Sequence, residues 1–502
     1  MIGPLLATVL GPLLLAALCL LQPRARLAPW CAAAGGALTL AVGTAALLDF
    51  MLHPGADFRL VERIDWSPFY GASLAVGVDA VAASMLVLSG LIALVATVAA
   101  WREDRSPRTF HALALALLAA INGVFTAQDF LLFYVSWEVL LVPMLLLIGL
   151  YGGSQRRYAA LKFFVFTLAG SVLMLLLLLL LWQAAPAGSK TFDLQQLTAQ
   201  WQVWRDTPFL GGTLAGFGFF AVLIACLVKL PAVPLHTWLP HAHVQAPTAV
   251  SVLLAGVLLK LSVYGLYRIA LPLFPTAAIA WGPALGALGL LGILWGAWVA
   301  LGQRDLKRLV AYASVSHMGF CLLALANLTP AGATASVVQA LAHGLSSPLL
   351  FLLVGVVYDR AHHRDVDGFG GLAQPMPRYA WLLLFGALAG CGLPGLGGFV
   401  GEFLSLASGF GAGAPFPAFS AAATLAVVLS AGYLLWTVQR VAYGPLRHAE
   451  QAAFPDIDRR ELLATLPLVA LLLLLGLYPG PLTTALRACS EALLHHVHGA
   501  RS

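Results

Sequence analysis

The sequence predicts an all-α polytopic membrane protein with about fourteen transmembrane helices. Of its 502 residues, 61% are hydrophobic and only 10% are charged, whereas a soluble domain carries about 25% charged residues. Apolar runs of about 20 residues, the length that crosses a bilayer, recur along the whole chain. Charged residues, or Pro and Gly, bound each run. These observations indicate that lipid surrounds most of the chain.

The first apolar run carries no basic residue before it, and Arg24 and Arg26 follow it. A cleaved signal peptide shows the reverse order, so this run is expected to be a retained helix with its N-terminus outside. The fourteen expected spans are 3–21, 28–49, 79–101, 111–127, 130–150, 158–184, 210–231 continuing past a break to 240, 247–268, 280–302, 308–327, 334–358, 378–410 with a break, 418–442 and 463–485.

The distribution of Lys and Arg tests this count of spans. With the N-terminus outside, 17 of the 27 basic residues fall in inner loops, 7 fall in outer segments and 3 lie inside spans. Inner loops of membrane proteins are enriched in Lys and Arg, and one missed helix would invert the side of every later loop. The inner loops also explain the net charge of +6 without a nucleic-acid partner.

Two spans contain prolines near their middles, at Pro231 and Pro234 and at Pro394. Proline interrupts the helix, and in lipid the carbonyl that it frees must find another partner. Paired broken helices five spans apart predict a repeat, with spans 4–8 and 9–13 as its two halves and a site between them; two ordinary kinks are the alternative. The expected organisation is helices 1–3 in 1–110, a first repeat in 111–270, a second in 271–443, and an inner loop, helix 14 and short tail in 444–502.

No redox cofactor or metal is expected in this chain. The six cysteines are scattered and no pair has CxxC spacing, so neither an iron–sulfur cluster nor a zinc site is indicated. No glycine-rich nucleotide-binding loop follows a strand pattern. His236, His241 and His243 cluster around Pro240 with a spacing that could suit a metal, but no carboxylate or cysteine is near, and the segment is expected to be inner-surface backbone.

Six ionisable residues lie deep within the spans, and they are the candidate site: Glu138, Lys229, Lys260, His317, His343 and Glu402. A charge at the bilayer centre costs roughly 2.5–3.5 kcal/mol on insertion, which makes such residues candidates for function. Histidine, with an unperturbed pKa of about 6.5, can relay protons between lysines and carboxylates. The pattern therefore favours proton transfer through a hydrated mid-membrane file.

Structural roles are the alternative for each of these groups. Glu138 and Lys229 could be an ion pair that pins two helices, and Lys260 shows no obvious partner in the sequence. The two histidines could be hydrogen-bonded packing residues, and Glu402 could cap backbone after its broken helix. Lys162, close to Arg156 and Arg157, is expected to extend to the inner surface.

Three segments resemble a known family. They begin at Leu227 (LVKLPAVPLHTWLPHAHVQAPTAVSVLLAGVLLKLSVYGLYR), at Asp305 (DLKRLVAYASVSHMGF) and at Gly392 (GLPGLGGFVGEF). They closely resemble the antiporter-like membrane subunits of respiratory complex I, from about span 3 to span 14. The resemblance implies fourteen core helices, two inverted repeats, no redox cofactor, and proton pumping driven by quinone reduction elsewhere in the complex.

With glutamate at position 402, the chain resembles the M-type branch of the family, also called NADH dehydrogenase subunit 4, which usually has glutamate there. The L and N types and the Mrp antiporter chains usually have lysine at this position. An L-type chain would also add a long C-terminal amphipathic helix, whereas only 17 residues follow the last expected span. By resemblance, Glu138 modulates Lys229 on the seventh helix, and Lys260 is the central lysine of the eighth.

In the second half, the resemblance makes His317 and His343 connecting groups and Glu402 the terminal proton-bearing group toward the outer side. His241 stands where many bacterial members have aspartate, at a position that varies in the family.

The expected function is that of a proton-translocating, non-redox subunit of NADH:quinone oxidoreductase in a bacterial inner membrane, with L-type and N-type chains as neighbours. A Mrp-type cation/proton antiporter, a membrane hydrogenase subunit of the same fold and a passive scaffold are the alternatives.

Overall fold

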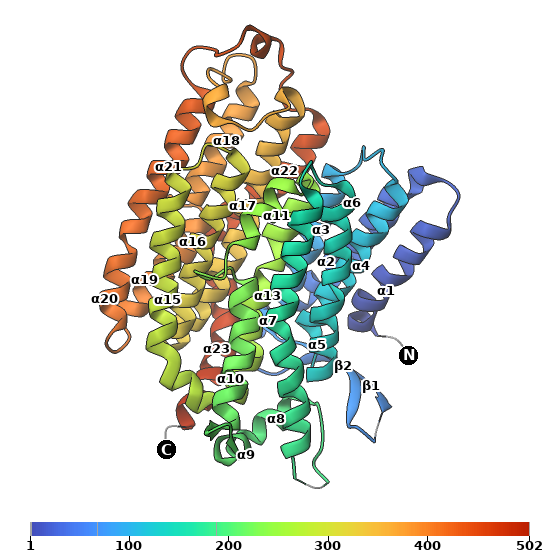
Figure 1. Ribbon diagram of the computed structural model, residues 1–502, viewed down its shortest axis with the longest axis vertical. Helices are drawn as coiled ribbons and strands as arrows, with labels where there is room; N and C mark the ends of the chain where they lie inside the picture. The colour runs from blue at the N-terminus through green and yellow to red at the C-terminus, as the bar shows by residue number, and fades with distance from the viewer. Residues whose placement is uncertain (1–2, 68, 187, 501–502) are drawn as a thin grey trace.

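The computed structural model describes residues 3–67, 69–186 and 188–500, which form a bundle of long helices (Figure 1). The transmembrane segments of the first half are α1 Pro4–Leu21, α2 Ala28–Leu52, α3 Ala80–Ala99, α4 Pro107–Thr126, α5 Phe130–Val139 with α6 Leu141–Tyr151, α7 Arg156–Ala184, α10 Leu214–Lys229 with α11 Trp238–Gln245, and one span made of α12 Thr248–Leu253, η2 Leu254–Leu258, α13 Lys260–Gly265, η3 Leu266–Ala270 and α14 Leu271–Leu273.

The segments of the second half are α15 Pro275–Leu301, α16 Leu306–Ala326, α17 Pro330–Ala361, α18 Pro377–Gly390 with α19 Gly397–Phe410, α20 Phe416–Ala423 with α21 Leu425–Ala442, and α22 Arg459–Leu477. In the described residues, 12 uninterrupted segments are long and apolar enough to cross a membrane. The two interrupted ones, α10–α11 and α18–α19, bring the total to the predicted fourteen. The chain is therefore a multi-pass membrane protein.

Short elements cover the outer end of the bundle, at the bottom of Figure 1. They are the antiparallel strands β1 Arg59–Ser67 and β2 Ala72–Val78, the helices α8 Leu194–Ala199 and α9 Trp201–Asp206, and the paired strands β3 Pro208–Phe209 and β4 Gly212–Thr213. Glu62 on β1 accepts hydrogen bonds from the backbone N–H groups of Leu5 (2.8 Å) and Leu6 (3.1 Å). The hairpin thus satisfies donors at the start of α1 that no helical carbonyl can reach.

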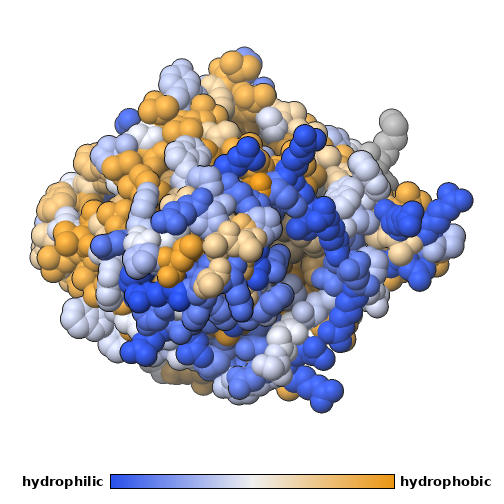
Figure 2. Space-filling model, turned by 90° about the horizontal axis from the view of Figure 1, so that it is seen from above, coloured by the Kyte–Doolittle hydropathy of each residue, from blue (hydrophilic) through white to orange (hydrophobic). Residues whose placement is uncertain are grey.

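The opposite, inner end carries the arginine-rich loops and three 3₁₀ turns, η1 Ala25–Leu27, η4 Val366–Gly368 and η5 Ala449–Ala453. Viewed toward this end, hydrophilic side chains gather over the middle and one side of the molecule, and hydrophobic ones dominate elsewhere (Figure 2). An apolar flank with a polar end is the pattern expected of a protein that stands across a bilayer.

Both predicted helix breaks are present. At the first, the indole Nε1 of Trp238 donates to the carbonyl of Val228 at 2.8 Å. The Trp238 side chain thus gives the carbonyl of Val228, which lies at the break, a hydrogen-bond donor. Such a donor is needed because lipid cannot satisfy a backbone carbonyl. At the second, Gly392 has a φ of +74°, a left-handed conformation that favours glycine.

The C-terminal end differs from the prediction. The last span ends at Leu477 rather than at 485, because Pro479 and Pro481 prevent the helix from continuing. The expected short tail is the helix α23 Gly480–Gly499. Its buried residues recur at the three- and four-residue spacing of an amphipathic helix: Ala485, Leu486, Cys489, Ser490, Leu494 and Val497. One face of α23 therefore packs against the bundle.

The centre of the bundle is α17, which contacts α16, α18, α19, α22 and α23 as well as α12. Its residues from Gly332 to Val357 are buried without interruption. A helix that is buried on all sides has no lipid-facing stripe, so its polar residues face other helices. This placement puts His343 at the junction between the two halves of the chain.

Candidate functional site

Lys229 is the last residue of α10 and is only 1% exposed. Its Nζ donates to the backbone carbonyl of Trp137 on α5 at 3.1 Å, and it lies 3.7 Å from the centroid of the Trp137 indole ring. The carbonyl dipole and the ring face both stabilise a cation without a counter-ion. The lysine is therefore docked against the helix turn that also carries Glu138.

Glu138 does not form an ion pair with Lys229 within the described part of the chain. One of its carboxylate oxygens, Oε1, is buried and has no hydrogen-bond partner among the protein groups described. A buried carboxylate oxygen without a partner is energetically costly and marks a place where another group or a water belongs. The two residues thus lie on neighbouring helices, with Lys229 against the residue next to Glu138, and form no ion pair among the described residues.

Lys260 starts α13, between the two π-turns η2 and η3, and is fully buried. Single π-turns within α-helices occur often at functional sites. The Nζ of Lys260 donates to the carbonyl of Ala255 inside η2 and lies 2.8 Å from Nδ1 of His343. This lysine, which showed no partner in the sequence, is in contact with the central helix α17.

The contacts continue from His343 into the second half. The rings of His343 and His317 have centroids 5.4 Å apart, and Nδ1 of His317 lies 3.0 Å from Oε1 of Glu402. Gln339 on α17 also reaches His317, with its Nε2 3.4 Å from Nδ1. Four ionisable side chains, each at most 7% exposed, therefore form one row from Lys260 to Glu402.

The absence of a side chain at Gly392, next to the second break, leaves space for the carboxylate of Glu402. A Cβ atom on Gly392 would lie 2.6 Å from Oε2 of Glu402, closer than two such atoms can approach. The carboxylate belongs to the second turn of α19 and contacts an imidazole; it does not cap the helix, whose N-cap residue is Leu396. The alternative of a backbone-capping glutamate is therefore wrong.

The structure thus divides the six predicted residues into two groups. The first group is Lys229, which contacts Trp137, and Glu138, which follows Trp137 in the chain. The second group is the connected row of Lys260, His343, His317 and Glu402. No hydrogen bond joins Lys229 to Lys260 among the described residues. The roles of all six in proton movement stay predictions.

Two buried basic residues near the inner face were not in the predicted site. His243 is fully buried, its ring is stacked on that of Phe351 with centroids 4.3 Å apart, and neither ring nitrogen has a hydrogen-bond partner in the part of the chain that the structure describes. Lys307, expected in an inner loop, is in α16, is 3% exposed and donates to the carbonyl of Ala246 at 2.7 Å. Helix α11 resumes after the break, so the expectation of surface backbone around His243 is wrong.

The signal that could have found His243 is the spacing of apolar residues after the break. Leu239, Ala242, His243 and Ala246 are buried together, which is the face of a short helix rather than a loop. The other histidines of this cluster point elsewhere: Nδ1 of His241 lies 3.4 Å from Nζ of Lys162. The described residues contain no cluster of three or more His, Cys, Asp or Glu side chains that could hold a metal ion.

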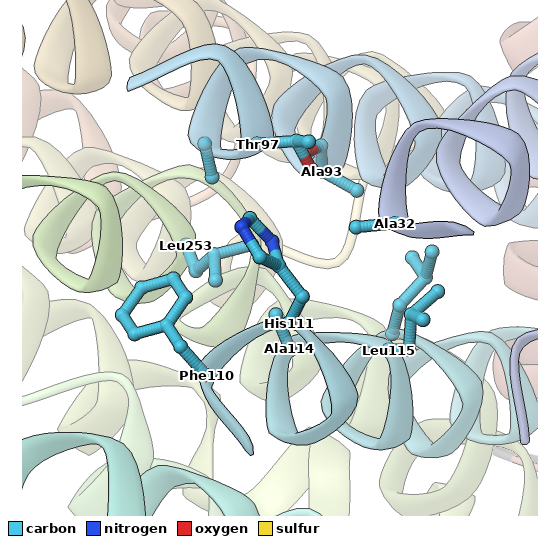
Figure 3. Close-up of a pocket in the computed structure, with 10 residues that line it drawn as sticks. Ala32, Ala93, Thr97, Phe110, His111, Ala114, Leu115 and Leu253 are labelled. Carbon is cyan, nitrogen blue, oxygen red and sulfur yellow. The ribbon is translucent and has the colours of Figure 1, made fainter. Parts of the chain in front are cut away.

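Lys307 lines an inner cavity of about 580 Å³ together with Arg364, Arg460 and Asp359. A polar cavity of this size holds many waters. A second, smaller cavity of about 10 Å³ surrounds His111 on α4 (Figure 3). His111 is 1% exposed and neither of its ring nitrogens has a partner in the described chain, so one water is the most that this space can add.

Comparison with known proteins gives a consistent picture. The family described as NADH:quinone oxidoreductase/Mrp antiporter, TM, matches residues 127–430. NADH-quinone oxidoreductase subunit M of Rhodobacter capsulatus is 39% identical over 479 residues, which cover 94% of this chain and 91% of that protein. The subunit M of Escherichia coli K12 is 41% identical over 428 residues, covering 83% and 82%.

Solved structures have the same fold. A chain of respiratory complex I from Thermus thermophilus with bound NADH superposes with a TM-score of 0.87 at 33% identity, covering 98% of this chain and 99% of that one. A chain of the Mrp complex from Dietzia sp. DQ12-45-1b has a TM-score of 0.84 at 22% identity, covering 98% of each chain.

Proposed function

The chain belongs to the NADH:quinone oxidoreductase/Mrp antiporter family, and from that premise we propose that it is a proton-translocating, non-redox subunit of the membrane arm of an NADH:quinone oxidoreductase. The observation that carries the mechanism is the row of four buried ionisable groups from Lys260 to Glu402. The row crosses four separate spans, those of α13, α17, α16 and α19, so it links the middle of the chain to its second half within the membrane.

The chemistry of this row suits proton relay. The nitrogen of Lys260 and Nδ1 of His343 lie at hydrogen-bond distance, and a proton can be shared only if one of the two is neutral. Imidazole changes protonation near physiological pH and has two nitrogens, so it can accept a proton on one side and release one on the other. Glu402 can then take the proton from His317 and carry it toward the outer side.

Uptake from the inner side is assigned to the cavity that Lys307 lines. His243 lies fully buried in α11, and neither of its ring nitrogens has a partner among the described residues. Ala246, which accepts from Lys307, is three residues further along the chain. Water in the cavity and the imidazole of His243 would together provide a route from the inner face toward Lys260.

Glu138 and Lys229 are proposed as the switch that couples this chain to a neighbour. In the structure they are apart, with Lys229 held by Trp137. Pairing the two would favour the charged lysine, and separating them would favour loss of its proton. A change of charge in an adjacent subunit could therefore alter the free energy of the Lys229 proton without moving the backbone.

The setting follows from the same premise. Other membrane-arm subunits, with L-type and N-type chains as neighbours, would hold this chain in a bacterial inner membrane, and electron transfer through redox cofactors would take place elsewhere in the complex. The F420H2 dehydrogenase subunit M of Methanosarcina mazei is 36% identical over 97% of both chains, so a complex with another electron donor is the second candidate. Purification of the intact assembly with its flavin-bearing partners, followed by an assay of donor oxidation, separates the two.

The direct test of proton translocation is Glu402→Gln in the intact complex. The amide keeps the shape of the side chain but cannot carry a proton, so NADH-driven acidification of inverted vesicles should fall at least about tenfold. The matched control is Glu491→Gln, which removes an exposed carboxylate that pairs with Arg487 on α23. Full pumping in an assembled Glu402→Gln complex would refute the proposed terminal role of Glu402.

A further inference from the structure

A cavity of about 270 Å³ opens near the outer end of the bundle, on the side opposite the arginine-rich loops. It lies between the start of α3, the turn η3 and the C-terminal helix α23. Its polar lining includes Asp79, Gln128, Tyr267, Arg268 and His496. None of these residues belongs to the proton row described above.

The inner wall of this cavity is the ion pair between Arg268 and Asp79. The guanidinium of Arg268 donates through Nη2 to Oδ2 of Asp79, and the two side chains are only 14% and 3% exposed. The other carboxylate oxygen of Asp79 accepts the N–H of Ala82 at 2.8 Å and caps α3. Both oxygens of Asp79 are therefore engaged by the protein.

Aromatic rings enclose the guanidinium. The Cζ atom of Arg268 lies 4.8 Å from the centroid of the Phe58 ring, 5.4 Å from that of Tyr264 and 6.0 Å from that of Tyr267. Cation–π contacts hold an arginine in place, and the rings exclude water from its faces. Hydrogen bonds around the pair extend this tight packing: Tyr267 contacts Ser490 of α23 at 3.4 Å, and His496 contacts the carbonyl of Pro272 at 2.9 Å.

The ion pair stands on the same helical span as Lys260. Lys260, Tyr264 and Arg268 follow one another at intervals of four residues, so they lie on one side of the span, which is about 12 Å long between the first and the last. The hydroxyl of Tyr264 donates to the carbonyl of Phe125 at 2.8 Å and accepts from Nε of Arg268 at 3.3 Å. On this side of the span, Arg268 therefore lies beyond Tyr264 and lines the outer cavity.

We infer that the Arg268–Asp79 pair is an outer plug, by which we mean that it blocks the passage of protons from Lys260, past Tyr264, to the water of the outer cavity. Protons on Lys260 are then confined to the row that leads to Glu402. The inference rests on the proposed function for the identity of Lys260 as a proton carrier. A guanidinium has five N–H donors, no acceptor, and keeps its proton in proteins. It cannot take up a proton from one water and release one to the next, as relay would require.

Charge adds to the seal. A fixed arginine near a pore raises the energy of an approaching hydronium, as arginines do in channels that exclude protons. Asp79 neutralises the pair as a whole, which lets the arginine stay buried, and each of its carboxylate oxygens already accepts a hydrogen bond from the protein. The alternative is that the pair only joins α3 to η3. Its position between Lys260 and the outer cavity favours a barrier to protons over that structural role.

The test is passive proton leak through the complete complex in proteoliposomes, without NADH. A pH-sensitive dye inside the vesicles reports an external acid pulse while valinomycin and potassium clamp the voltage. Arg268→Ala should raise the leak roughly tenfold or more, because it removes both the barrier charge and the volume that excludes water. Asp79→Ser with Arg268→Ala leaves no unpaired carboxylate and keeps a capping hydroxyl, so it provides the same test if the single variant fails to assemble.

Two further variants make the result specific. Arg205→Ala removes an outer-face arginine that pairs with exposed Asp206 and should leave the leak unchanged. Adding Lys260→Met to Arg268→Ala should return the leak to the wild-type level, because the leak would pass through Lys260. An assembled Arg268→Ala complex without extra leak overturns the inference, and so does a leak that persists with Lys260→Met. The leak is measured without NADH, so it does not depend on pumping. The test of the plug can therefore be evaluated even if the proposed pumping function is wrong.

Discussion

The two broken helices place their ionisable residues differently with respect to the break. At the first break, Lys229 is the last residue of α10, where the helix dipole favours a cation. At the second break, Glu402 comes after the gap, in the second turn of α19, which is beyond the turn over which a helix dipole acts. The difference shows that the first break provides a half-helix end for its charge, whereas the second places its carboxylate beside a side-chain partner.

The partners of the two residues also differ. Lys229 is held by a carbonyl and an aromatic ring, groups that do not change protonation. Glu402 instead contacts another ionisable side chain, the imidazole of His317. The first break therefore holds Lys229 against groups of fixed protonation, whereas the second break places Glu402 in the row that is proposed to carry protons. This contrast predicts larger effects from lesions in the row than from lesions around Lys229.

The largest effect is expected from Lys260→Met. It removes the group that donates to Ala255 and contacts His343, so the row loses its inner end. Pumping by the intact complex should fall about 100-fold, the lower range for removal of an acid–base group. Proton uptake assays on inverted vesicles give the measurement. Lys190→Met, which removes an exposed outer lysine stacked on Trp182, should leave pumping at the wild-type level.

His317→Leu should have the next largest effect. The leucine fills the site but cannot bridge His343 and Glu402, whose link depends on Nδ1 of His317. Pumping should fall at least about tenfold while the complex still assembles, since relay and not packing is lost. If pumping in the assembled variant equals the wild type, the row through His317 is not the route.

Glu138→Gln should have a smaller effect on pumping. Because Glu138 makes no direct ion pair with Lys229, it acts on the lysine only through its electrostatic field. We therefore expect pumping to fall about fivefold. The measurement is the ratio of protons pumped to NADH oxidised, with the expressed complex quantified in parallel. A loss as large as that of Lys260→Met would place Glu138 in the relay itself and would remove the distinction between the two breaks.

The smallest effect concerns stability at the first break. Trp238→Phe removes the only side-chain donor described for the carbonyl of Val228 and should destabilise the fold by about 1 kcal/mol. The thermal midpoint of the detergent-solubilised complex reports the change. Trp281→Phe, at a partly lipid-exposed position on α15 with 46% exposure, is the matched control and should shift the midpoint less.

The membrane class, the number of spans and the position of both breaks could be predicted from the amino-acid sequence. A protein in lipid needs long apolar runs and internal hydrogen bonds, so its composition and the placement of its prolines indicate these features directly. The same requirement drew attention to the six ionisable residues within the spans, because charge inside an apolar run is rare. These features depend on local sequence and on the solvent, and not on which helices meet.

Which charged side chains are in contact became known from the packing of the helices. His343 and Lys260 are 83 residues apart in the chain, and nothing in either segment encodes their contact. The same holds for the Arg268–Asp79 pair, for the burial of His243 and Lys307, and for the packing of α23. Helix periodicity fixes the face on which a side chain lies, but the partner of that face is chosen by packing among all the helices at once.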